Sequence, residues 1–221
     1  MRPMLLLATL CATLSTSFAE PLDLGPVKKW IARQEEFRSV QADFTQTRAL
    51  RALRSPVAIP GRIWFNTPNY LRWELGDPAK TIVLRKGDIY LLVQPAKKKA
   101  QRLSAAKIGP EGGAKGFAMM EFPLASDFAE FQRKFEVLGV KTGDTRCDLD
   151  LLPRGAQARK FLSALKIAFD TTTGHLISFE MVTRDGSSMR NDFTNVRLNP
   201  KIDRRVFEYD LTGFEVTEEK N

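Results

Sequence analysis

The residue types that most often carry catalysis are sparse in this chain of 221 residues. His175 is the single histidine, and it stands in the turn sequence TTTGHLI. A Ser-His-Asp or Cys-His site needs a base held beside a nucleophile, and a lone turn histidine is more often a surface residue. The two cysteines and His175 form no cluster with zinc spacing. We therefore expect no catalytic residue, no metal and no cofactor.

Two further patterns suggest chemistry, but each has a simpler interpretation. Asp148 and Asp150 alternate with Leu149 and Leu151 in CDLDLL, as in a strand whose acids face water. The glycine-rich stretch GPEGGAKG lacks the Lys-Ser/Thr ending and the strand-to-helix context of a phosphate loop. We interpret it as a flexible loop. An enzyme, such as a secreted hydrolase, remains only a remote alternative.

Apolar side chains that need burial are far more abundant in this sequence than candidate acid-base residues. In GRIWFNTPNYLRWEL (61–75), two apolar runs flank an Asn-Thr-Pro-Asn turn, and Leu71, Trp73 and Leu75 share one face. The methionines of residues 117–122 are unbranched and adaptable, which suits apolar ligands of variable shape. The pattern allows either an ordinary core or a ligand cavity. The candidate cavity and lid residues are Phe44, Ile63, Phe65, Leu71, Trp73, Leu91, Phe117, Met119, Met120 and Phe122.

The N-terminus indicates export. Residues 1–19 combine Arg2, an apolar run and Ser17-Phe18-Ala19, which is the pattern of a cleaved secretory signal. An uncleaved anchor is the alternative. Cleavage lowers the net charge from +8 to +7, since only Arg2 is lost, and leaves Cys147 without a disulfide partner. In an exported protein, the basic excess suits anionic lipid headgroups or acidic protein faces better than nucleic acid. General solubility is the alternative explanation of this charge.

The remaining pattern predicts one domain over residues 20–221. An amphipathic helix is expected over 26–37, a loop or ragged sheet edge over 49–60, and helical pieces over 117–124 and 126–135. So many short strands predict a large antiparallel sheet that curls towards a barrel. The expected strands are 39–48, both arms of 61–75, 81–86, 89–94, 98–104, 135–141, 147–153, 161–170, 175–185, 188–199 and 206–211.

Taken in order, these segments resemble the outer-membrane lipoprotein carrier family, LolA. SVQADFTQTR is similar to the family's first strand, and GRIWFNTPNYLRWEL to its Gly-x-Leu/Ile-Trp, Pro-Asn and Trp segment. LDLLPR, the segment from LKIAFD to VRLNP, and DRRVFEYDLTG resemble its C-terminal half. The resemblance implies an α+β, mainly antiparallel, incompletely closed β-barrel with a helical lid.

The resemblance also implies a function. It suggests a periplasmic carrier, expected to be monomeric, whose cavity shields the acyl chains of lipoproteins without a cofactor. Cargo would come from an inner-membrane ABC transporter and pass to an outer-membrane lipoprotein receptor, with no part played by nucleic acid. Leu71 and Trp73 would line the cavity, and residues 117–122 would supply lid contacts.

One position departs from the family pattern. Where the resemblance implies an arginine that latches the lid, this chain has Thr67. Threonine cannot make the multiple charged hydrogen bonds of a guanidinium, and Arg72 is expected to face away from Leu71. Three alternatives follow: another group latches the lid in its place, the lid is looser, or the cargo is another lipid or lipid-linked compound.

Overall fold

The computed structural model describes residues 22–105, 125 and 127–218. Its helices are α1 (Gly25–Gln34), α2 (Phe128–Lys134), α3 (Ala156–Phe161) and the short 3₁₀ turns Pro95–Lys97 and Arg204–Phe207. Its strands are β1 (Ser39–Ala49), β2 (Val57–Asn66), β3 (Tyr70–Leu75), β4 (Thr81–Lys86), β5 (Ile89–Gln94), β6 (Lys99–Ser104), β7 (Phe135–Thr142), β8 (Arg146–Pro153), β9 (Leu162–Asp170), β10 (Leu176–Thr183), β11 (Ser188–Leu198) and β12 (Glu215–Glu218).

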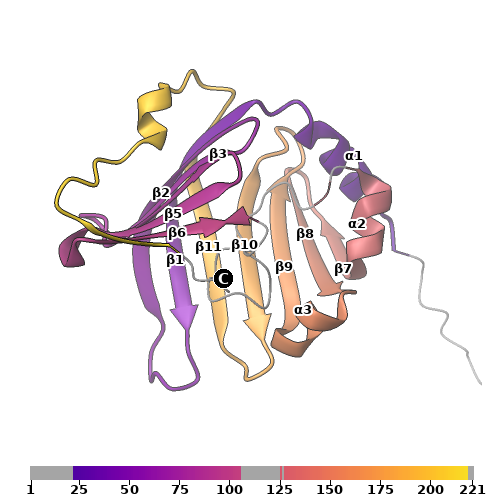
Figure 1. The fold of residues 1–221 in the computed structure, drawn as a ribbon. Coiled ribbons are helices and arrows are strands. Elements are labelled where there is room, and N and C mark those ends of the chain that lie inside the picture. The colour runs from indigo at the N-terminus through magenta and orange to yellow at the C-terminus, as the bar shows by residue number, and fades with distance from the viewer. Residues whose placement is uncertain (1–21, 106–124, 126, 219–221) are drawn as a thin grey trace, which may run out of the picture.

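All twelve strands join one sheet in the order β12-β6-β5-β4-β3-β2-β1-β11-β10-β9-β8-β7. Neighbouring strands are antiparallel, except that β12 runs parallel to β6. The sheet curls around a concave face without closing (Figure 1). The predicted α+β fold, an incompletely closed antiparallel barrel with helical elements, is confirmed.

Two helices cover one half of the concave face. Val27, Trp30 and Ile31 of α1 and Phe131 of α2 are buried in one cluster with the apolar residues of β8, β9 and β10. The Trp30 ring stacks on Phe169 with 4.6 Å between ring centroids. The helices predicted over 26–37 and 126–135 are therefore confirmed, although α1 ends at Gln34, before Phe37. The helical piece expected over 117–124 lies outside the described residues. None of the helices formed by the described residues is long and apolar enough to cross a membrane.

The convex face over β4 to β6 is covered by the C-terminal segment. Arg72 of β3 donates from Nη1 to the backbone oxygens of Val206 (2.8 Å) and Glu208 (3.1 Å), which holds this segment against the sheet. As expected, Arg72 faces away from Leu71. Side chains of the segment then pack on the outer faces of β4, β5 and β6, through Tyr209, Leu211 and Phe214.

The secondary structure differs from the prediction in several segments. Residues 206–211 form no strand: Val206 and Phe207 belong to the turn Arg204–Phe207, and the half-buried side chains of Tyr209 and Leu211 pack on the outer face of the sheet. Residues 57–60, expected in a loop or ragged edge, extend β2, and Pro60 pairs with Thr45 of β1. Pairing of β2 with β3 begins only at Gly61, and the carbonyl of Pro60 accepts from the N–H of Gly76 (2.7 Å), the residue that follows β3. Helix α3 was not predicted.

Candidate functional site

A cavity of about 610 Å³ opens on the concave face beside α1. This volume lies within the range of small-molecule sites. Most of its lining is apolar and comes from β1, β2, β3, β10 and β11, with the residues that follow α1 at its rim. Among the residues that the structure describes, the concave face therefore encloses a cavity beside the helices.

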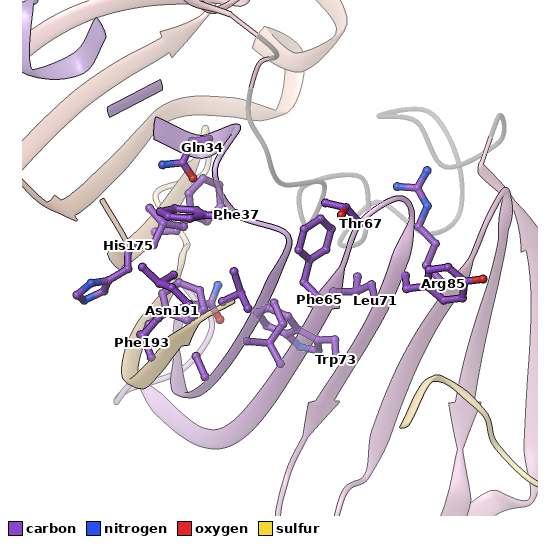
Figure 2. A pocket seen from close by; sticks show the side chains of 18 of the residues that line it. Gln34, Phe37, Phe65, Thr67, Leu71, Trp73, Arg85, His175, Asn191 and Phe193 are labelled. Carbon is purple, nitrogen blue, oxygen red and sulfur yellow. The ribbon is translucent and has the colours of Figure 1, made fainter. Parts of the chain in front are cut away.

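Four apolar residues predicted from the hairpin meet in the wall of this cavity. Ile63 pairs with Trp73, and Phe65 pairs with Leu71, so all four share the concave face of β2 and β3. Figure 2 shows Phe65, Leu71 and Trp73 side by side. Leu71 and Trp73 are buried, whereas Ile63 and Phe65 are half-buried. Thr67, at the turn of the hairpin, lines the same cavity, and its N–H donates to the carbonyl of Arg38 (2.8 Å).

Phe44 supports this wall from behind. It is 2 % exposed and does not line the cavity, but its ring lies 4.0 Å from that of Trp73 and packs over Gly61. A Cβ atom at position 61 would come within 2.1 Å of the Phe44 ring. The glycine therefore makes the room that Phe44 needs to hold Trp73 in place.

Leu91 lies on the opposite face of the sheet from the predicted site. It pairs with Leu84, which pairs with Arg72, and all three belong to the convex face. The concave neighbours on β5 are Tyr90 and Leu92, which pack with Trp73 and Val83. The placement of Leu91 in the cavity was therefore wrong. The candidate lid residues Phe117, Met119, Met120 and Phe122 lie outside the described residues.

The second wall of the cavity comes from β10 and β11, which the sequence analysis did not assign to the site. Phe179, Met181, Met189 and Phe193 line it. Strands were predicted over 175–185 and 188–199, but the sequence analysis did not predict that their apolar side chains face the 61–75 hairpin across a cavity. His175, expected at the surface, is half-buried and also lines the cavity (Figure 2).

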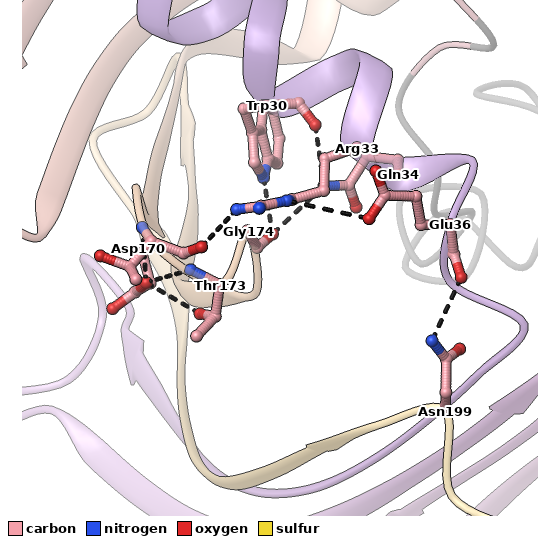
Figure 3. A network of polar contacts seen from close by, with 9 residues as sticks. Trp30, Arg33, Gln34, Glu36, Asp170, Thr173, Gly174 and Asn199 are labelled. Atoms are coloured by element: carbon pink, nitrogen blue, oxygen red, sulfur yellow. Dashed lines mark hydrogen bonds and ion pairs between the residues drawn. The ribbon is translucent and has the colours of Figure 1, made fainter.

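The α1 rim of the cavity is fixed to the turn between β9 and β10. The carbonyl of Gly174 accepts from Trp30 Nε1 (2.9 Å) and from Gln34 Nε2 (3.2 Å), and Arg33 donates to the carbonyl of Thr172 (Figure 3). Of these hydrogen bonds, the one from Trp30 Nε1 is buried, and leaving a buried donor without its acceptor is costly. In this structure α1 is thus fixed by hydrogen bonds to the β9–β10 turn, and none of these three bonds involves Thr67.

The polar groups around His175 form a turn and not a nucleophile–base pair. Thr173 Oγ1 lies 2.8 Å from Asp170 Oδ1 and 2.6 Å from His175 Nδ1. A carboxylate only accepts, so the single hydroxyl proton of Thr173 goes to Asp170, and His175 must donate from Nδ1. His175 therefore cannot take the proton from Thr173 in this geometry.

The aspartate pair on β8 is also structural. Leu149 and Leu151 are buried while Asp150 is exposed, which confirms the predicted alternation. The hydrogen bonds from Arg146 to Asp148 lower the pKa of that carboxyl group, which makes it a poor general acid. Cys147, in the same strand, is buried, and this burial raises the pKa of its thiol. The described residues contain no group of three His, Cys, Asp or Glu side chains placed to hold a metal ion.

Comparison with known proteins assigns this hollow barrel to a family. A family model described as outer membrane lipoprotein carrier protein LolA matches residues 35–210, which include most of the sheet and the cavity walls. The chain belongs to the LolA family. The outer-membrane lipoprotein carrier protein of Dechloromonas aromatica (strain RCB) is 21% identical over 172 residues, which are 78% of this chain and 77% of that protein.

Solved structures of other proteins share the fold of this LolA family member. An uncharacterized conserved protein from Thermus thermophilus has a TM-score of 0.55 at 8% identity, covering 87% of this chain and 99% of that chain. The complex structure of Pseudomonas aeruginosa MucA/MucB gives a TM-score of 0.50 at 16% identity, covering 83% of this chain and 60% of that chain. At these identities, the likeness shows the fold alone.

Proposed function

We propose that this protein is a periplasmic carrier that shields the acyl chains of lipoproteins and moves them from the inner to the outer membrane. The observation that carries the proposal is the cavity of about 610 Å³, walled by Ile63, Phe65, Leu71 and Trp73, in a chain of the lipoprotein-carrier family. Its lipoproteins would come from an ABC transporter and leave to an outer-membrane receptor, with the carrier acting as a monomer.

The physical need for such a carrier is large. Each methylene exposed to water costs about 0.8 kcal/mol, so a chain of about fifteen methylenes costs roughly 12 kcal/mol. A preformed apolar cavity offsets this cost without chemical change to the cargo. Release then requires a partner that favours another conformation or binds the cargo more tightly.

A carrier of another lipid is the second candidate, and Thr67 favours it. Thr67 lines the cavity mouth where the family resemblance implies a latching arginine. A hydroxyl offers one donor where a guanidinium offers five. With fewer hydrogen bonds available at Thr67, the cavity would be closed less firmly at this position. Such a cavity suits a lipid that is taken up and released in a different way from lipoproteins.

The bound cargo decides between these candidates. We expect the protein purified from the periplasm of producing cells to carry triacylated lipoprotein that is detectable by mass spectrometry of the intact complex. A different bound lipid would replace the first candidate with the second. Protein without any lipid, which also binds no fluorescent apolar probe, would refute both.

A further inference from the structure

One polar side chain interrupts the apolar wall formed by β10 and β11. Asn191 is 4 % exposed and lines the cavity between Met189 and Phe193 of its own strand, opposite Phe179 of β10 (Figure 2). Burying an amide among apolar side chains is costly unless its polar atoms are paired. The placement of Asn191 therefore calls for a partner for each of its polar atoms.

The orientation of the Asn191 amide is fixed by residues behind it. Arg48 Nε can only donate, and it lies 2.7 Å from Gln46 Oε1. Gln46, which is 1 % exposed, must therefore turn its Nε2 away from Arg48, and this group donates to Asn191 Oδ1 (3.0 Å). Asn191 is thus obliged to use its oxygen towards Gln46 and to present Nδ2 elsewhere.

The Nδ2 group of Asn191 has no acceptor among the residues that the structure describes. In that part of the chain, the only fully buried side-chain nitrogen or oxygen without a partner is Trp73 Nε1, so Nδ2 keeps accessible surface. Because Asn191 lines the cavity, that surface belongs to the cavity. Two side-chain nitrogens of cavity-lining residues, Asn191 Nδ2 and Trp73 Nε1, thus lack an acceptor from the described residues, and of the two only Nδ2 keeps accessible surface.

We infer that Asn191 Nδ2 binds a carbonyl oxygen of the cargo, which makes the site selective for acyl esters and amides over plain hydrocarbon or ether chains. The inference rests on the proposed acyl-binding function. A hydrocarbon chain would leave the donor unpaired, whereas the ester or amide carbonyl at the head of an acyl chain supplies the acceptor. The hydrogen bonds from Arg48 to Gln46 and from Gln46 to Asn191 orient Nδ2 before the cargo binds. The Asn191 side chain therefore loses little conformational freedom on binding.

Two lipids that differ only in this carbonyl test the inference. The full mature protein is titrated with palmitoyl lysophosphatidylglycerol and with its hexadecyl ether analogue, each below its micelle concentration. One hydrogen bond contributes about 1 kcal/mol, so we expect the ester to bind about fivefold more tightly. Because the headgroup is the same in both lipids, the basic charge of the protein cancels in the ratio.

Variants at position 191 assign the preference to this side chain. Asn191→Leu should reduce the ratio to about one. The double variant Gln46→Leu/Asn191→Leu removes both partners of the buried hydrogen bond and leaves no unpaired donor, so it should also abolish the preference, and it decides the matter if the single variant does not fold. Thr194→Val, on an exposed residue of the same strand, should retain the wild-type ratio.

The outcomes separate this inference from the proposed function. Equal binding of ester and ether by the wild type, or a preference that survives in a folded Asn191 variant, overturns the role of Asn191 while acyl binding stands. Failure of the wild type to bind either lipid overturns both.

Discussion

A Phe65→Glu variant is expected to keep its fold and to lose most of its affinity for acyl chains. Phe65 is half-buried in the cavity wall opposite Leu71, so a carboxylate there can remain hydrated through the cavity mouth. The hydrated carboxylate prevents the acyl chain from contacting this part of the cavity wall. Loss of contact with about three methylenes costs roughly 2.4 kcal/mol, or about fiftyfold in affinity. Titration with a fluorescent monoacylglycerol, which carries no charge to be repelled, measures the loss.

Val57→Glu is the matched control for this variant. Val57 begins the same strand, β2, and is 44 % exposed outside the cavity. Its substitution should leave both the affinity and the thermal unfolding midpoint near those of the wild type. Unchanged probe affinity in folded Phe65→Glu would mean that acyl chains bind somewhere other than this wall.

Gly61→Ala is expected to destabilise the protein by about 3 kcal/mol, at the upper end of the usual cost of overpacking a core. The new Cβ would lie 2.1 Å from Phe44 Cζ and 2.6 Å from the backbone oxygen of Glu74. The Phe44 ring could move, but only by leaving Trp73. The backbone of β3 cannot move without breaking its pairing with β2. Urea unfolding, followed by circular dichroism, gives the change in free energy.

Gly155→Ala controls for the general effect of replacing glycine. A methyl group on Gly155 would have no neighbouring atom within 4 Å, and the residue has an ordinary φ of −63°. It precedes α3, where exchange of glycine for alanine costs less than about 1 kcal/mol. If Gly61→Ala were no more destabilising than this control, the contact between Phe44 and Gly61 would not support the cavity wall.

The face that lines the cavity was predictable for some strands and not for others, for a physical reason. In β1, Val40, Ala42 and Phe44 alternate with polar residues because only the concave side is packed, so the sequence marks the face directly. In β5, the convex side is covered by the C-terminal segment and the concave side by its own cluster. Both faces of IYLLVQ are therefore apolar, and alternation could not distinguish Leu91 from Leu92.

The polar features of the site were beyond sequence reasoning because they join distant segments. Gln46 and Asn191 are 145 positions apart in the chain and meet only through the β1–β11 pairing. The one local indication of a polar contact was Gln46, which lies on the otherwise apolar face of β1. The Trp30–Gly174 contact likewise spans 144 positions. A helix as short as α3 (Ala156–Phe161) is too short to show a clear hydrophobic period in the sequence, and it forms only because the strands around it fold.

Photo-crosslinking tests the central claim most directly. A monoacylglycerol with a diazirine in its chain is bound to the wild-type protein and activated by light, and the modified residues are identified by peptide mass spectrometry. If acyl chains occupy the cavity, the crosslinks will fall on its two walls, at residues such as Phe65, Leu71 and Phe193. Crosslinks concentrated on the convex face, around Leu91 and Tyr209, would contradict the account.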